Sequence, residues 1–201
     1  MHIVTKHLIM PVLLFGLLLG VSTAPSFAQT IDINDPGTSD PYHPALVQYR
    51  VGYYFQLQGD HERAIEEFTA VIEAFPNWDG GYSARGDSYA ALGRYELAIT
   101  DYDEALDLTP GFVSVLYMRG RAYVATGEIE LAGEDYASAT QQAPSYALPY
   151  WGMGDLAYEQ GDLTAAFVFY QQYIAITITP PDVEVIARVS TLEVILSAGD
   201  A

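Results

Sequence analysis

The sequence predicts an all-α protein: an α-α superhelix made of four helical hairpins and one capping helix. Three observations support this prediction. Several kinds of residue recur with a step of 34 positions, and apolar residues near the C-terminus recur at helical spacing. In addition, 50% of the residues are hydrophobic and only 17% are charged, which favours a packed core over a disordered chain.

The 34-residue step is kept by small, aromatic and proline residues. The series are Gly52, Gly86, Gly120 and Gly154; Gly59, Gly93, Gly127 and Gly161; Ala64, Ala98, Ala132 and Ala166; Phe68, Tyr102, Tyr136 and Tyr170; and Pro76, Pro110 and Pro144. One step shared by several independent series indicates a repeated supersecondary unit.

Each series has a mechanical role in a helical hairpin. The first glycine and the alanine let two antiparallel helices approach closely, and the aromatic residue four positions after the alanine fills the adjoining space. The second glycine ends the first helix in a left-handed conformation, and the proline closes the unit. We therefore expect two helices of about fourteen residues in each unit.

This pattern resembles the tetratricopeptide repeat, whose length, paired helices and small, aromatic and proline positions it shares. The units that show the resemblance are 45–78, 79–112, 113–146 and 147–179. Two positions depart from the family pattern. Gln48 stands where the other units have tyrosine or leucine, and Ile178 stands where proline is expected. The polar edge at Gln48 suits an N-terminal unit.

Residues 180–198 are expected to form one capping helix. Thr179 reads as its N-cap, with proline at the first helical position. The apolar residues that follow at helical spacing are Val185, Ile186, Val189, Leu192, Ile195 and Leu196. Such a helix typically covers the apolar face of the last repeat. Val183 and Val194 do not belong to this apolar set, and a dimer contact is the alternative role for them.

The first 28 residues have the order of a signal peptide. A positive charge at Lys6 precedes an apolar run from Leu8 to Val21, and Ser26-Phe27-Ala28 provides small residues for a signal peptidase. The run is short for a membrane span of about 20 residues. We predict cleavage after Ala28 and a periplasmic or secreted protein, with an uncleaved N-terminal anchor as the alternative. Residues 29–44 then form a flexible acidic leader.

Charge and composition exclude several classes of function. The formal net charge is −18, and it is −19 for residues 29–201 because the only lysine precedes them. Such a charge repels nucleic acid and anionic lipid, so we expect neither a nucleic-acid partner nor stable membrane insertion after signal cleavage. The absence of cysteine excludes disulfides and thiolate ligands. No catalytic, cofactor or metal motif is recognisable, and we expect no enzyme.

Two arginines are predicted to form structural ion pairs. Arg85 and Arg119 occupy one repeat position, and the same two units carry Asp101 and Asp135 on their second helices. The first and fourth units lack both partners. We therefore expect a buried or half-buried arginine–aspartate pair between the helices of each middle hairpin.

In proteins of this family the first helices line a concave groove, and the resemblance implies which residues lie there. The candidate binding residues are Tyr49, Tyr53, Asp87, Tyr117, Arg121, Trp151, Asp155 and Tyr158, with Leu46, Gln56, Ser83, Val124 and Leu148 beside them. Tyrosine and tryptophan dominate binding hot spots. The alternative is that several of these rings pack between repeats. Arg121 is the expected cation of the groove.

We expect a peptide segment or a partner helix to bind in this groove, with Arg121 and Asp87 selecting its polar groups. A saccharide or other small ligand stacked on the same rings is the alternative. Some family members grip a peptide's C-terminal carboxylate with lysines and asparagines. The corresponding positions here are Tyr49, Tyr53, Ala84, Ser114 and Met118, so this mode does not transfer. The resemblance further implies a scaffold or assembly factor for envelope complexes.

Overall fold

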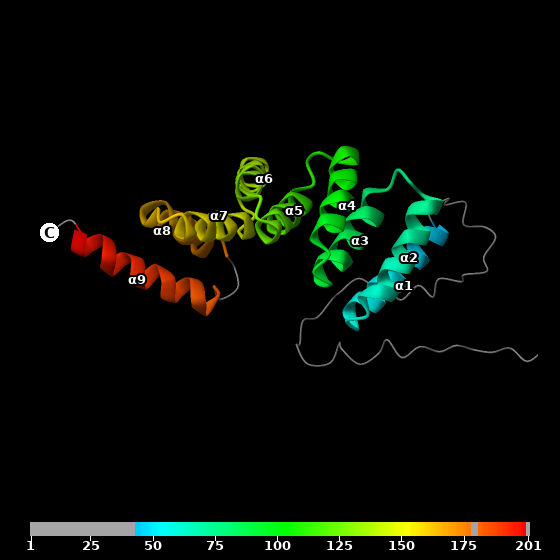
Figure 1. Cartoon of the computed structure of the whole chain (residues 1–201), viewed down its shortest axis with the longest axis horizontal. Helices are drawn as coiled ribbons and strands as arrows, with labels where there is room; N and C mark the ends of the chain where they lie inside the picture. The colour runs from blue at the N-terminus through cyan, green and yellow to red at the C-terminus, as the bar shows by residue number, and fades with distance from the viewer. Residues whose placement is uncertain (1–42, 178–180, 200–201) are drawn as a thin grey trace, which may run out of the picture. The chain divides into compact units, whose positions relative to one another are not determined.

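The computed structural model describes residues 43–177 and 181–199, which form nine helices. These helices are α1 (His43–Leu57), α2 (His61–Ala74), α3 (Asp79–Ala91), α4 (Tyr95–Leu108), α5 (Val113–Thr126), α6 (Ile129–Gln142), α7 (Leu148–Glu159), α8 (Leu163–Ile176) and α9 (Val183–Gly199) (Figure 1). The predicted all-α fold of four hairpins and a final helix is confirmed. The predicted signal peptide and leader lie almost entirely outside the described residues.

The hairpins pack in sequence order. Each helix contacts the next one along the chain, from α1 to α9. The odd-numbered helices also contact one another, α1 with α3, α3 with α5 and α5 with α7. Within the described residues no such contact joins α2, α4, α6 and α8 to one another. Helices α1, α3, α5 and α7 therefore form the inner face of the row of hairpins.

The glycine and aromatic series meet inside each hairpin. A Cβ atom added at Gly120 would stand 2.5 Å from the ring of Tyr136, and one added at Gly86 would stand 2.8 Å from Tyr102. The ring therefore occupies the space that a side chain would need, which confirms the predicted close approach. Tyr136 also lies 2.5 Å from the Cβ position of Gly152, so this ring joins the third hairpin to the fourth.

The predicted ends of the first helices are also confirmed. Gly59, Gly93, Gly127 and Gly161 follow α1, α3, α5 and α7 with φ angles of 75°, 72°, 89° and 80°. This left-handed region is open to glycine and costly for other residues. The glycine after each first helix thus lets the chain turn back into the second helix of the same hairpin.

The two arginine–aspartate pairs form as predicted. Arg85 donates from Nε and Nη2 to the carboxylate oxygens of Asp101, at 2.8 and 2.7 Å. Arg119 and Asp135 repeat this geometry at 2.8 and 2.7 Å. Arg119 also reaches back to the preceding hairpin, where Asp103 of α4 accepts a bond of 2.6 Å. This arginine therefore ties two neighbouring hairpins together, which the sequence comparison did not predict.

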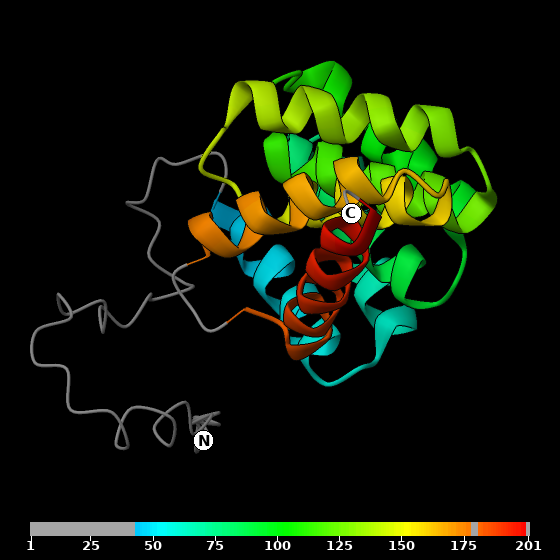
Figure 2. The same cartoon turned by 90° about the vertical axis from the view of Figure 1, so that its left-hand side faces the viewer.

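Helix α9 packs against α8 at the C-terminal end of the row, as Figure 2 shows. Val185 and Leu192 are 1% and 0% exposed and lie in one cluster with Tyr170 and Tyr173. The backbone N–H of Glu184 donates to the Asp182 carboxylate at 2.8 Å, so this carboxylate accepts a bond in the first turn of α9. The expected N-cap at residue 179 and the proline after it lie outside the described residues.

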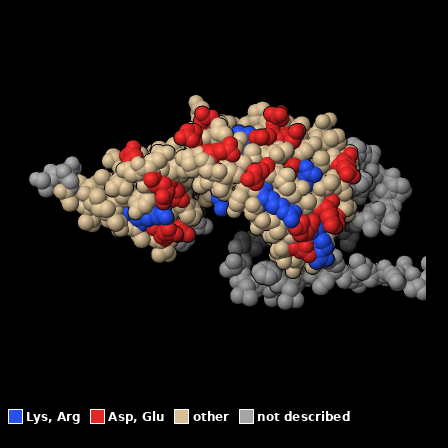
Figure 3. All heavy atoms as spheres, in the orientation of Figure 1, with Lys and Arg blue, Asp and Glu red and all other residues tan. Residues whose placement is uncertain are grey.

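The surface is acidic. Figure 3 shows acidic side chains over the face that it presents, with the fewer basic ones mostly beside them. Val183 and Val194 of α9 are 81% and 67% exposed. The alternative of a dimer contact at these two valines stays a prediction. No described helix is both long enough and apolar enough to span a membrane.

Candidate functional site

A hollow of about 840 Å³ lies on the inner face, between side chains of α3, α5 and α7. The side chains that line it come mainly from these three helices, with additions from α4 and α6. They are Asp87, Ala90, Ala91, Tyr95, Tyr102, Tyr117, Met118, Arg121, Ala122, Val124, Ala125, Ile129, Tyr136, Trp151, Gly152, Asp155, Leu156, Glu159 and Gln160. The hollow thus combines aromatic walls with a few charged groups.

The structure places the predicted binding residues in two groups. Those that line the hollow are Asp87, Tyr117, Arg121, Trp151 and Asp155. The other three lie elsewhere. Tyr49 packs between Phe68 and Trp78, with ring centroids 5.4 and 5.0 Å away, so its main contacts are structural. Tyr53 and Tyr158 are 51% and 38% exposed and do not line the hollow.

The aromatic walls are held in place by packing. Tyr117 is 9% exposed, and its ring lies 5.8 Å from that of Tyr136 and 6.2 Å from that of Tyr146. The ring of Trp151 lies 5.5 Å from that of Tyr173. Burial raises the pKa of Tyr117, so its hydroxyl stays neutral near pH 7. A ligand therefore meets rigid and uncharged rings.

Charged side chains alternate in sign along the inner face. Asp87, Arg121 and Asp155 are 34 residues apart and come from α3, α5 and α7, so they occupy one position in successive hairpins. All three line the hollow. The alternation offers a ligand a cation flanked by two carboxyl groups.

Arg121 differs from the other arginines of the described chain. Ion pairs engage Arg63, Arg85, Arg94, Arg119 and Arg188. Within the described residues, Arg50 and Arg121 have none, and of these two only Arg121 lines the hollow. Its guanidinium carbon lies 5.9 Å from the centroid of the Tyr117 ring. Arg121 is therefore an exposed cation beside an aromatic wall, available to an anionic group.

Each of the two aspartates accepts a hydrogen bond from a tyrosine of its own hairpin. The Tyr102 hydroxyl donates to Asp87 at 2.8 Å, and the Tyr170 hydroxyl donates to Asp155 at 2.6 Å. Burial raises the pKa of Asp87, and the bond from Tyr102 only partly opposes this shift. Burial likewise raises the pKa of Asp155. Both carboxylates are thus partly deprived of water, which strengthens their attraction for a cation.

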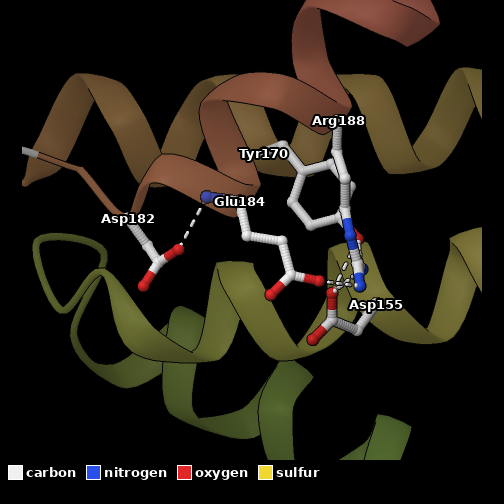
Figure 4. A network of polar contacts seen from close by, with 5 residues as sticks. All are labelled: Asp155, Tyr170, Asp182, Glu184 and Arg188. Carbon is white, nitrogen blue, oxygen red and sulfur yellow. Dashed lines mark hydrogen bonds and ion pairs between the residues drawn. The ribbon is translucent and has the colours of Figure 1, made fainter.

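Arg188 of α9 was not among the predicted site residues. Its Nη1 donates to Asp155 at 2.7 Å and to the Tyr170 hydroxyl at 2.8 Å, while Nη2 donates to Glu184 at 2.7 Å (Figure 4). Arg188 lies in the capping helix, outside the 34-residue comparison. The sequence contained one sign of a specific role for this side chain, because Arg188 is the only basic residue after Arg121.

Tyr102 and Tyr136 were also assigned to packing alone, although both line the hollow from second helices. They are 0% and 2% exposed, so packing remains their main role. A charged residue of the same hairpin stands 15 positions before each tyrosine, Asp87 before Tyr102 and Arg121 before Tyr136. The same aspartate–tyrosine spacing recurs at Asp155 and Tyr170, and this recurrence was a signal for the hydrogen bond that Tyr102 donates to Asp87.

The described residues hold no group of three or more histidine, cysteine or acidic side chains that could bind a metal ion. The chemistry of the hollow in this part of the chain is therefore that of aromatic contact, the guanidinium of Arg121 and the carboxyl groups of Asp87, Asp155 and Glu159. These groups bind and orient a ligand by hydrogen bonds and charge.

Models of the tetratricopeptide repeat match three parts of the chain. A model described as TPR repeat matches residues 86–127, and two described as Tetratricopeptide repeat match residues 117–182 and 46–77. A search of curated protein sequences found no match. Together with the helical architecture, these matches identify the fold as a tetratricopeptide-repeat solenoid.

Solved structures with this fold are similar to the chain at low sequence identity. MamA 41-end from Desulfovibrio magneticus RS-1 has a TM-score of 0.67 and 19% identity, over 77% of this chain and 86% of that one. The first TPR of Spaghetti (RPAP3), bound to an HSP90 peptide, has a TM-score of 0.57 and 23% identity, over 58% and 93%.

A third similar structure is larger. The match to the APC/C hetero-tetramer Cut9-Hcn1 has a TM-score of 0.68 and 21% identity, and it covers 79% of this chain but only 32% of that one. The present chain thus corresponds to about a third of the matched chain. At these identities the likeness concerns the fold alone.

Proposed function

We propose that this tetratricopeptide-repeat solenoid is an exported protein-interaction module that binds an extended peptide segment of a partner protein in the hollow on its inner face. The observation that carries the proposal is the position of Arg121. It lines a hollow of about 840 Å³, beside the Tyr117 ring, and no described side chain forms an ion pair with it. Such an arginine is suited to bind a carboxylate of the partner.

The aromatic walls support a peptide as the ligand. Trp151 is half-buried and Tyr117 is 9% exposed, and their neighbours Tyr136 and Tyr173 hold both rings in place at the edge of the hollow. Preorganised walls of this kind lose little entropy when a chain binds. The first TPR of Spaghetti (RPAP3) was solved with an HSP90 peptide, so a domain of this fold can take a short peptide.

The mode of peptide binding proposed here relies on one cation. The positions at which some relatives hold a terminal carboxylate carry Tyr49, Tyr53, Ala84, Ser114 and Met118, none of which is basic. Arg121 can instead bind a single acidic side chain, while the rings contact the flanking residues. Export by a signal peptide cleaved after Ala28, and a role as a scaffold in the cell envelope, complete the proposal.

Site-specific photocrosslinking tests it. A photoreactive phenylalanine derivative replaces Val124, which lines the hollow and is 40% exposed. The matched control replaces Leu131 of α6, which is 39% exposed and does not line the hollow. Irradiation of cells should attach a polypeptide to position 124 and not to position 131. Adding R121A and W151A should abolish the adduct, and mass spectrometry of the adduct identifies the partner.

Two results would contradict the proposal. Equal adducts at positions 124 and 131 would show contact without use of the hollow. Adducts that survive R121A and W151A together would show that neither side chain takes part. If no polypeptide is attached and a glycan array instead binds in a Trp151-dependent manner, the saccharide alternative replaces the peptide.

A further inference from the structure

Two hairpins carry the same aspartate–tyrosine pair at the same repeat positions. Asp87 and Tyr102 in the second hairpin correspond to Asp155 and Tyr170 in the fourth, each 68 residues later. In both hairpins the tyrosine hydroxyl donates to Oδ1 of the aspartate, at 2.8 and 2.6 Å. The first and third hairpins lack the pair, because they have Tyr53 and Arg121 in place of the aspartate.

In the fourth hairpin an arginine binds the pair. Arg188 reaches from α9 and donates from Nη1 both to Asp155 and to the oxygen of Tyr170 (Figure 4). The hydroxyl of Tyr170 therefore has two roles at once: it donates to the carboxylate and accepts from the guanidinium. Asp155 and Tyr170 thus form a ready receptor for an arginine side chain, and the chain itself fills it.

In the second hairpin the equivalent pair borders the hollow, with Asp87 half-buried and Tyr102 0% exposed. Asp87 and Tyr102 both line it, and within the described residues no basic side chain binds Asp87. The neighbouring Arg85 is engaged by Asp101 and Thr69. The Tyr102 hydroxyl donates to Asp87 and retains lone pairs that can accept a bond, as in the fourth hairpin.

The second hairpin also has more room for a ligand. The residue equivalent to Tyr158, whose ring lies 5.3 Å from the guanidinium carbon of Arg188, is Ala90. Ala90 lines the hollow. The small side chain leaves space at the place where the fourth hairpin has a ring.

We propose that Asp87 and Tyr102 form the subsite for an arginine side chain of the bound peptide, in the way that Asp155 and Tyr170 hold Arg188. This inference rests on the proposed function, and it defines the chemistry of the partner. Asp87 binds the basic residue and Arg121 binds an acidic one. The partner segment therefore carries both an arginine and an acidic residue within a few positions of each other.

The separation of the two residues follows from the spacing of the helices. Helices in contact lie about 8–10 Å apart, and an extended chain advances about 3.3 Å per residue. Asp87 and Arg121 come from α3 and α5, which contact each other. An arginine and a glutamate separated by about three positions would therefore reach both side chains at once.

A peptide library supplies the test. Fluorescent dodecapeptides with one arginine and one glutamate, set one to five positions apart in both orders, are titrated with the purified protein by fluorescence anisotropy. The tightest peptide is then compared with a version in which norleucine replaces arginine. The protein variants are D87N, Y102F and the control D107N, which removes the same charge from an exposed position of α4.

The expected result is a coupling between Asp87 and the peptide arginine. D87N should weaken the binding of the arginine peptide about tenfold or more, and it should leave the binding of the norleucine peptide almost unchanged. Y102F should weaken the binding of the arginine peptide severalfold. D107N should have little effect on the binding of either peptide. The amide of D87N can still accept the bond from Tyr102, so the variant should keep its fold, which its thermal midpoint verifies.

Other outcomes overturn the inference in distinguishable ways. In one outcome, peptides bind, R121A weakens their binding, and D87N affects the arginine and norleucine peptides equally. The proposed function then stands, and the proposal of an arginine subsite is wrong. Equal effects of D87N and D107N would have the same meaning, because only net charge would then matter. If no peptide of the library binds, the proposed function and this subsite both fail.

Discussion

The guanidinium of Arg119 donates from Nε and Nη2 to the two carboxylate oxygens of Asp135, at 2.8 and 2.7 Å. The side chain of Asp135 is 7% exposed and that of Arg119 is 21% exposed. Removing the arginine would leave a buried carboxylate without its cation, which is costly in a protein interior. The pair should therefore contribute to the stability of the solenoid.

R119M should lower the free energy of unfolding by about 3 kcal/mol, measured by urea denaturation. The control is R94M, because Arg94 pairs with Glu62 on the surface, where both side chains are about half exposed. Loss of such a pair costs less than about 1 kcal/mol. Equal effects of the two substitutions would contradict a special role for the buried pair.

G120A should also destabilise the fold. The added methyl group would stand 2.5 Å from the Tyr136 ring, and that ring is confined by Gly152 on its other side. We expect a loss of about 1–3 kcal/mol in the free energy of unfolding.

The matched control for G120A is G133A in α6. The nearest heavy atom to its added Cβ is a Leu156 carbon at 4.0 Å, so the methyl group has room. Alanine is the better helix former, and G133A should stabilise by up to about 1 kcal/mol. If G120A stabilised the protein, the Tyr136 ring would be able to move aside. This result would contradict the role assigned to the close approach of Gly120 and Tyr136.

D87N should change how stability depends on pH. Because burial raises the pKa of Asp87 in the folded state, this group favours folding most at low pH, where it is protonated in both states. That advantage is lost as the pH rises through the raised pKa. The thermal midpoint of D87N relative to wild type should therefore increase from below pH 4 towards pH 7.

The control for this measurement is D107N, which reports the effect of removing one negative charge from an acidic chain. The difference in thermal midpoint between D107N and wild type is subtracted at each pH. A remaining difference for D87N that falls with rising pH would contradict a raised pKa of Asp87, since it would mean that the ionised carboxylate stabilises the fold.

R188A should loosen α9 without disturbing the other hairpins. Arg188 joins α9 to Asp155 of α7 and to Tyr170 of α8, in addition to its bond with Glu184. Hydrogen exchange of the α9 amides should accelerate about tenfold or more, while α1 to α6 keep their protection. The control E193A alters an exposed residue of the same helix. Unchanged exchange in R188A would mean that the apolar contacts of Val185 and Leu192 hold α9 alone.

Mass spectrometry of the exported protein checks the predicted processing. The N-terminal residue should be Gln29, because cleavage after Ala28 fits the small residues that a signal peptidase requires. An intact Met1 would contradict this prediction and favour the uncleaved anchor.

The elements that could be predicted are those whose partners lie within one hairpin. Gly120 and Tyr136 are 16 residues apart, as are Arg119 and Asp135, and in both cases the partners face each other across one turn. The geometry of a helical hairpin is nearly constant from copy to copy. A repeated pair in the sequence is therefore a repeated contact in the structure.

Contacts between hairpins were less predictable. Tyr49 was assigned to the groove, yet its ring packs against Trp78, which immediately precedes α3 of the second hairpin. The bond from Arg119 to Asp103 likewise crosses from one hairpin to the preceding one. Such contacts depend on the angle between neighbouring units, and the 34-residue step carries no information about that angle.

By itself, therefore, the sequence determined the number and direction of the helices, the turns at the four positive-φ glycines and the ion pairs of the middle hairpins. Their causes are local: backbone conformation at glycine, and side chains that meet within one hairpin. Only the tertiary structure decided which side chains line the hollow, and that Arg188 binds Asp155 while no basic side chain of the described residues binds Asp87. These outcomes depend on how α9 and the hairpins dock, because docking brings together residues that no repeat relates.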